Sequence, residues 1–134
     1  MNTIRVGRRS NIQDQSVLHG VIERYEVVIG DEVTVGHCGL VHGCVVEDRC
    51  LVGMGSRILS GAVVGAESIV AAGAVVKEGQ RIPPRSLVAG VPAAVKRALT
   101  DADVTLIREY CSNYLEYRTI YKALEGDLPR MLAR

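Results

Sequence analysis

Aliphatic residues recur at every sixth position through the middle of the chain. The position four places after each aliphatic residue is small in most repeats, and glycine directly follows the aliphatic residue at Gly53 and Gly65. A six-residue unit fits one short strand with an inward aliphatic side chain and one turn, where glycine permits a tight bend or a positive φ. The unbroken series is Val46, Val52, Ile58, Val64, Val70, Val76, Ile82 and Val88.

Three such units close one triangular coil of 18 residues, and stacked coils pair as parallel strands about 4.8 Å apart. The pattern therefore predicts an all-β solenoid, a parallel β-helix of hexapeptide repeats, over residues 1–95 with about five coils. Upstream the same pattern continues in shifted frames. The earlier aliphatic positions are Ile29, Val35 and Val41, preceded by Val6, Ile12 and Leu18. The frame therefore shifts between 18 and 29 and again between 41 and 46. A regular repeat usually tolerates such a shift where a functional site or an interface needs the backbone in a different direction.

A helix is predicted over residues 100–125, because the periodicity changes after Pro92. The segment Thr100–Asp103 resembles an N-cap with acidic residues in the first turn, and Gly126 and Pro129 give the stop. The apolar face is expected to lie along the β-helix, and residues 126–134 form a tail. The positions with helical spacing, interrupted by Arg118, are Val104, Ile107, Cys111, Tyr114, Tyr121 and Leu124.

The composition narrows the possible partners and the compartment. A net charge of +1 without Trp or Phe argues against nucleic acid binding, and no apolar run reaches the length of a signal peptide or a membrane span. We expect a cytoplasmic protein with reduced thiols. Although Cys38, Cys44 and Cys50 are spaced by six, that spacing turns them to different faces of a triangular coil, so we expect structural roles for them.

All three histidines of the chain, His19, His37 and His42, lie next to the frame shifts. His19 and His37 are 18 residues apart, about one coil. Three imidazoles that leave a fourth position to water form a catalytic zinc arrangement, which lowers the pKa of the bound water to about 7; Fe²⁺ and Co²⁺ suit the same ligands. The alternative is three unrelated turn residues. Glu23 and Glu26 are candidate proton shuttles or simple loop carboxylates.

Several motifs together resemble the γ-class carbonic anhydrase family over residues 3 to about 125. The two-histidine segment with Asn-x-Gln-Asp upstream distinguishes that family from hexapeptide acyltransferases, which share the repeat and the Gly-x-Pro-Ala ending. The segments that carry the resemblance are Asn11-Ile-Gln-Asp14, Ser16-Val-Leu-His19, Val35-Gly-His37-Cys-Gly-Leu-Val-His42-Gly-Cys44, Val52-Gly-Met-Gly55, Ala71-Ala-Gly73 and Val88-Ala-Gly-Val-Pro-Ala93.

The resemblance implies a left-handed β-helix and a homotrimer, with one Zn²⁺ or Fe²⁺ at each subunit interface. His19, His37 and His42 match the metal ligands, and His37 would come from the neighbouring chain. Gln13 matches the residue that hydrogen-bonds the hydroxide or bicarbonate on the metal, and Asp14 its acidic neighbour. Tyr114 matches a helix tyrosine that faces the pocket in family members, or else is a core residue. The implied reaction is the reversible hydration of CO₂ to bicarbonate.

Family members carry additional N-terminal coils before the segment that begins here at Asn2, and those coils supply an arginine and an aspartate to the interface. Arg8 and Arg9 do not match that arginine. A short natural version and a truncation are both open. Two other functions also stay open: a catalytically silent metal-binding or assembly homologue, and a hexapeptide acyltransferase, which needs only one catalytic histidine.

Overall fold

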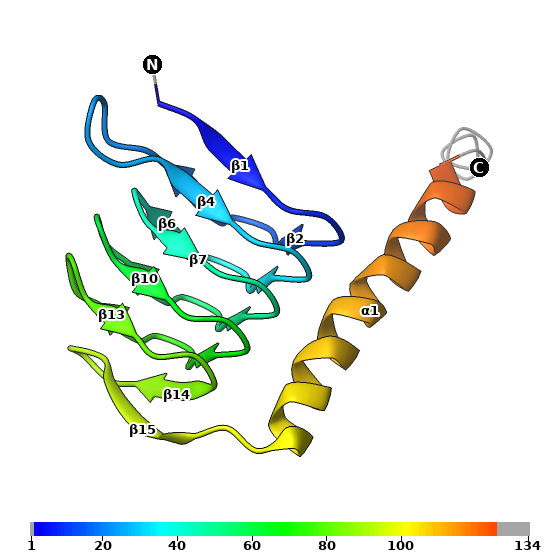
Figure 1. The fold of residues 1–134 in the computed structure, drawn as a ribbon. Coiled ribbons are helices and arrows are strands. Elements are labelled where there is room, and N and C mark those ends of the chain that lie inside the picture. Colours follow the sequence, from blue (N-terminus) through cyan, green and yellow to red (C-terminus); the bar gives the residue numbers. More distant parts are fainter. Residues whose placement is uncertain (1, 126–134) are drawn as a thin grey trace.

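The chain winds into stacked triangular coils in a computed structural model that describes residues 2–125 (Figure 1). The coils form a left-handed parallel β-helix with three sheets, as predicted. Sheet A contains β1 (Ile4–Val6), β4 (Val27–Ile29), β7 (Val45–Val46), β10 (Val63–Val64) and β13 (Arg81–Ile82). Sheet B contains β2 (Asn11–Ile12), β5 (Thr34–Val35), β8 (Leu51–Val52), β11 (Ile69–Val70), β14 (Ser86–Ala89) and β15 (Ala94–Ala98). Sheet C contains β3 (Val17–His19), β6 (Leu40–His42), β9 (Arg57–Ile58) and β12 (Val75–Val76).

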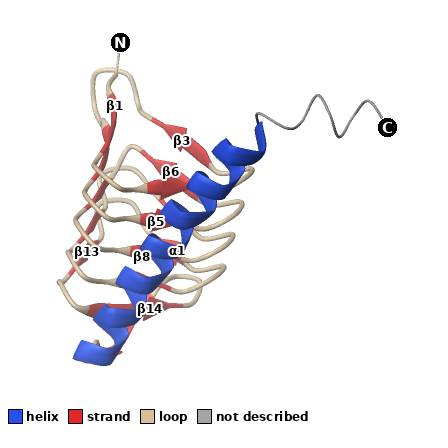
Figure 2. Ribbon diagram, turned by 90° about the vertical axis from the view of Figure 1, so that its right-hand side faces the viewer, coloured by secondary structure: helices blue, strands red, loops and turns tan. Residues whose placement is uncertain are grey.

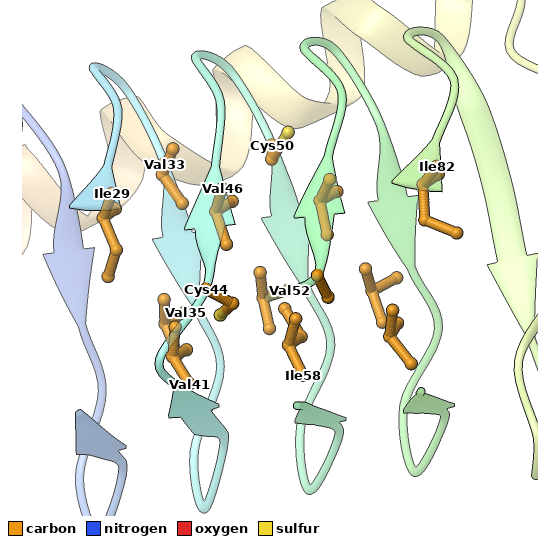
Figure 3. Packing of buried hydrophobic residues seen from close by; sticks show 14 of the residues in the cluster. Ile29, Val33, Val35, Val41, Cys44, Val46, Cys50, Val52, Ile58 and Ile82 are labelled. Carbon is orange, nitrogen blue, oxygen red and sulfur yellow. The ribbon is translucent and has the colours of Figure 1, made fainter. Parts of the chain in front are cut away.

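The predicted aliphatic positions form columns inside the coils. In sheet B, for example, Val35, Val52, Val70 and Val88 stack with no exposed surface. Small side chains fill the corners between the columns, among them Cys44 and Cys50, and Figure 3 shows them turned inward beside the valines. Burying each such aliphatic side chain contributes about 1.5–3 kcal/mol, which explains why two-residue strands suffice.

The two frame shifts are an insertion and a deletion in otherwise regular coils. A regular coil has 18 residues: Val63 pairs with Arg81, and His42 contacts Ser60, each at a separation of 18. The first coil is longer, because residues 20–26 leave it as a loop and His19 comes to lie opposite His42, a separation of 23 residues. The second coil is one residue shorter, since Asp31 and Asp48 stack at a separation of 17.

The turns between sheets A and B each contain a charged residue with positive φ, and the sign of the charge alternates from coil to coil. Arg9 Nε lies 3.2 Å from Glu32 Oε1, and Arg49 Nε lies 2.9 Å from Glu67 Oε1. Arg85 follows, with Nη1 3.7 Å from Glu67 and Nη2 2.5 Å from Asp101 at the start of the helix. We call Arg9, Glu32, Arg49, Glu67 and Arg85 the charged turn column.

The long helix α1 (Asp101–Glu125) covers sheet B after the antiparallel strand β15 closes the last coil (Figure 2). Thr100 and Asp103 exchange capping hydrogen bonds, and the pKa of the Asp103 carboxyl lies well below its usual range because Arg97 and Thr100 donate to it. Val104, Ile107 and Cys111 are buried against the sheet, as predicted.

The predicted apolar stripe of the helix is wrong at Tyr121 and Leu124. Both are exposed, as is every described side chain from Glu116 onward, because the helix is longer than the part of it that packs on the sheet. Within the described residues no helix combines the length and the apolar character needed to cross a membrane. The predicted tail, 126–134, lies outside the described residues.

Candidate metal centre

His19 and His42 form a pair at the end of sheet C. Each is the last residue of its strand, β3 or β6, and the parallel register places them directly opposite each other. His19 Nδ1 lies 3.1 Å from His42 Nε2, and the rings stack with centroids 4.9 Å apart. Two nitrogens on one tetrahedral zinc ion, each about 2.0–2.1 Å from the metal, are separated by roughly 3.3 Å. The pair therefore has the spacing of two ligands of a single ion.

His37 lies at the opposite end of β6, in the turn between sheets B and C. The expectation that His37 lies one coil from His19 is wrong, because the five additional residues of the 20–26 loop place His42 there instead. Among residues 2–125 no group of three His, Cys, Asp or Glu side chains lies close enough to hold a metal ion. One chain thus presents two nitrogen donors at one corner of the triangle and a single one at the next.

The surroundings of His37 contain the other predicted site residues. Asp14 lies in the same turn one coil earlier, and its Oδ2 is 3.6 Å from His37 Nδ1. Gln13 precedes it and donates through Nε2 to Asn11 Oδ1 at 2.7 Å. Tyr114 and Tyr110 of the helix line a pocket together with His37. Gln13, Asp14, His37 and Tyr114 therefore gather at the corner between sheets B and C.

Two polar residues at this corner were given no role by the sequence analysis, although Asn11 belongs to the Asn-x-Gln-Asp motif. Asn11 Nδ2 donates to Thr34 Oγ1 at 2.9 Å, so Thr34, which is nearly buried, holds the amide to which Gln13 is bonded. Apart from that motif, the available signal was that both residues directly precede an inward aliphatic, Ile12 or Val35, on outward-facing positions of sheet B.

Ser60, another residue that was missed, contacts the histidine pair. Its Oγ lies 3.0 Å from His42 Nδ1, on the side of the ring away from His19. Tyr25 from the 20–26 loop folds over the same corner, since a Cβ at Gly61 would lie 3.1 Å from its ring. Val21, Arg24 and Glu78 complete the shallow pocket around His42 and Ser60.

The remaining candidate groups lie apart from the histidines. Cys38 is exposed in a turn, whereas Cys44 and Cys50 are in the core, where burial raises the pKa of each thiol to about 12. Glu26 lies 3.9 Å from Arg5 on the outer face of sheet A, and the backbone N–H of Glu23 donates to Asn2. Neither glutamate makes an ion pair or hydrogen bond with a histidine in the described part of the chain.

Comparison with known proteins agrees with the hexapeptide repeat and with the resemblance to γ-class carbonic anhydrases. Residues 43–78 match the bacterial transferase hexapeptide family (six repeats). A Methanocaldococcus jannaschii protein named "Probable carbonic anhydrase" is 43% identical over 94% of this chain and 77% of its own length. The mitochondrial gamma carbonic anhydrase 1 of Arabidopsis thaliana is 41% identical over 85% of this chain. This chain spans 43% of that plant protein.

Among solved structures, a hexapeptide transferase family protein from Anaplasma phagocytophilum superposes with a TM-score of 0.82. It is 34% identical, and the superposition covers 88% of this chain and 69% of that one. The coil architecture is thus shared with a hexapeptide transferase family protein, and the sequence match to the Methanocaldococcus jannaschii protein spans 94% of this chain at 43% identity. The chain belongs to the γ-class carbonic anhydrase family of hexapeptide-repeat proteins.

Proposed function

We propose that this protein is a metal-dependent enzyme that reversibly hydrates CO₂ to bicarbonate. The observation that carries the proposal is the pair His19 Nδ1 and His42 Nε2, 3.1 Å apart, with His37 displayed alone at the next corner. Two donors at one corner and one at another complement each other when copies of the chain meet around a threefold axis. A homotrimer would then hold three equivalent sites, each with His37 supplied by the neighbouring copy.

The residues present fit a catalytic metal ion with nitrogen ligands, namely Zn²⁺, Fe²⁺ or Co²⁺. When bound, such an ion supplies a hydroxide nucleophile at neutral pH. His19 and His42 would hold the ion from one side and His37 from the other. The carboxylate of Asp14, 3.6 Å from His37 Nδ1, attracts the N–H at that position and so leaves Nε2 of His37 for the ion.

Gln13 would orient the reacting oxygen. Its amide nitrogen is held by Asn11, which is held in turn by Thr34, so the direction of the side chain is fixed. The carbonyl oxygen Oε1 is left to accept a hydrogen bond from a hydroxyl group, which aims the lone pair of that hydroxyl at the carbon of CO₂. Tyr114, in the pocket beside His37, would limit access to the site. Neither Glu23 nor Glu26 contacts a histidine in the described residues, so proton transfer to either would require intervening water.

Two alternative functions, a catalytically silent assembly protein and an acyltransferase, can be distinguished from the enzyme by assays on the purified protein. Stopped-flow measurement of CO₂ hydration on metal-loaded protein, kept anaerobic to protect Fe²⁺, tests the enzyme directly. A rate equal to that of buffer at full metal occupancy would favour the silent homologue. Saturable binding of an acyl-CoA would favour an acyltransferase. That alternative is tested because the chain shares its fold with a hexapeptide transferase family protein.

The shared site itself predicts a specific complementation. His37→Ala should lose metal, by elemental analysis, while its mass in solution stays three times that of the 14.4 kDa chain, because a smaller side chain fits this half-exposed turn without strain. His42→Ala should behave likewise. Refolding the two variants together should restore metal and activity to about a quarter of the interfaces, since random assembly places an intact histidine pair beside an intact His37 at that frequency.

The outcome separates a shared site from any other arrangement. A site built within one chain stays broken in both variants, so mixing them would restore nothing. Retention of full metal by His37→Ala alone, or a monomeric mass for the unmodified protein, would contradict the proposal.

A further inference from the structure

Ser60 lies beside the histidine pair because of the one-residue deletion in the second coil. Val41 pairs with Ile58, and the N–H of Gly61 donates to the carbonyl of Gly43. Between these two fixed points the third coil has two residues, Leu59 and Ser60, whereas the second coil has only His42. The Ser60 side chain therefore has no residue of its own stacked on it, and the imidazole of His42 occupies that space.

The hydroxyl of Ser60 contacts one specific nitrogen of the ring. Its Oγ is 3.0 Å from Nδ1, while Nε2 of the same ring faces His19 at 3.1 Å. A neutral imidazole carries one proton, and the hydrogen bond made by one nitrogen decides whether the other is free to bind a metal. With Nδ1–H donating to Ser60, the lone pair on Nε2 is directed at the space shared with His19.

The opposite arrangement, in which the Ser60 hydroxyl donates to Nδ1, would place the ring proton on Nε2 and block that position. The pocket around Ser60 opens to solvent and includes the exposed carboxylate of Glu78. The carboxylate only accepts hydrogen bonds and water can accept them, so a Ser60 hydroxyl that points outward can donate to them while its oxygen accepts from the ring.

We propose that Ser60 is a positioning residue that holds His42 in the Nδ1–H tautomer and so prepares Nε2 for the metal. The metal part of this inference rests on the proposed function. The tautomer part does not, because it concerns the protein without metal. Removing a hydrogen-bond partner of a metal-ligating histidine typically weakens metal binding about 10–100-fold.

The test compares Ser60→Ala, Ser60→Thr and a matched control, Ser10→Ala. Ser10 loses a hydroxyl of the same size at another corner, where its Oγ donates to Gly30 O and accepts from Val33 N–H without touching a histidine. Long-range ¹H–¹⁵N NMR spectra of the metal-free protein report which nitrogen of His42 is protonated. Competition with a chromophoric chelator gives the Zn²⁺ affinity.

We expect the unmodified protein, Ser60→Thr and Ser10→Ala to show Nδ1–H on His42, and Ser60→Ala to move toward the Nε2–H form. Zn²⁺ affinity should fall about 10–100-fold in Ser60→Ala alone. An Nε2–H tautomer in the unmodified protein, or an unchanged tautomer in Ser60→Ala, would overturn the inference whatever the enzyme activity. If the tautomers are as expected but the protein binds no Zn²⁺, the result would count against the proposed function. It would still support the role of Ser60 in holding His42 in the Nδ1–H tautomer.

Discussion

Gly53 lies where the backbones of two successive coils approach each other closely. A Cβ built on this residue would lie 2.5 Å from Ala72 N and 2.7 Å from Val70 O, distances that real side chains do not reach. Its φ is not positive, so the left-handed conformation that the sequence allowed for is not the reason for this glycine. Glycine is required here because the coil beneath leaves no space for a side chain.

We expect Gly53→Ala to lower the free energy of unfolding by about 1–3 kcal/mol, the usual cost of forcing an extra carbon into a packed site. The cost is unavoidable, because the atoms that would clash belong to the backbone of residues 70–72. Urea unfolding followed by circular dichroism measures the change.

The matched control is Gly55→Asn. Gly55 has a φ of +66° and open space beyond its Cα, and Asn tolerates that backbone conformation, so a loss of less than about 1 kcal/mol is expected. Equal losses for the two variants would mean that backbone conformation, and not the contact between coils, sets the requirement at Gly53.

At the scale of the elements, the charged turn column joins the coils to one another and to the helix. Glu67 is its centre, with a side chain only 18% exposed and Arg49 at 2.9 Å. Arg85 and Arg108 lie at 3.7 and 3.8 Å, and Arg108 belongs to α1. One carboxylate thus neutralises three guanidinium groups from two neighbouring turns and the helix.

Glu67→Ala should therefore destabilise the protein by about 1 kcal/mol, at the upper end of the range for surface ion pairs, because several partners lose the same carboxylate. The loss should shrink in high salt, which screens exposed charges. Glu26→Ala is the matched control: within residues 2–125 the one ion-pair partner of Glu26 is Arg5, at 3.9 Å, and both are well exposed, so no measurable change is expected. Urea unfolding at two salt concentrations distinguishes the two variants, and a loss for Glu67→Ala no larger than that for Glu26→Ala would argue against a role for the column.

The strands could be predicted from the sequence because the aliphatic residues alone mark their positions. Val70 or Val76 can be assigned to the interior because the aliphatic repeat has one dominant cause, burial, and the frame shifts at 18–29 and 41–46 correctly marked the irregular coils. The sequence did not reveal that the first shift adds five residues to a coil, which is why His42 and not His37 lies over His19. The roles of Ser60, Asn11 and Thr34 were not predicted, because each role depends on which residue of the neighbouring coil lies beside it.

At the scale of the whole molecule, a continuous core holds thiols that must stay protonated. Burial raises the pKa of Cys44 and of Cys50 from 9.0 to about 12, chiefly through loss of solvation of the thiolate. A thiol with a pKa raised in the folded state stabilises the fold fully below pH 9. Above pH 9 the unfolded chain gains stability by ionising, and this continues until the folded thiols ionise near pH 12.

We therefore expect the free energy of unfolding to fall by about 1 kcal/mol for each of the two thiols between pH 9 and pH 10, because the unfolded thiol goes from half to almost fully ionised over that interval. Urea unfolding in the presence of a reductant, at pH 8, 9 and 10, measures the slope. Other groups also titrate in this range, so the double variant Cys44→Ala with Cys50→Ala provides the reference, and its slope should be shallower by the thiol contribution. An identical slope in the two proteins would show that the thiols ionise equally in the folded and unfolded chains.

The 20–26 loop has a consequence for how the length of this chain can vary. It leaves the coil after His19 and returns before Val27, closed on itself by the bridge between Val21 and Tyr25, so its tip takes no part in the stacking of the coils. Residues can be added or removed at that tip without moving either histidine. A single residue gained between Val27 and His42 would instead rotate every later position by one place and turn the second imidazole away from the first. The chain length can thus vary in the 20–26 loop, whereas the length of the segment from Val27 to His42 is fixed by the histidine pair.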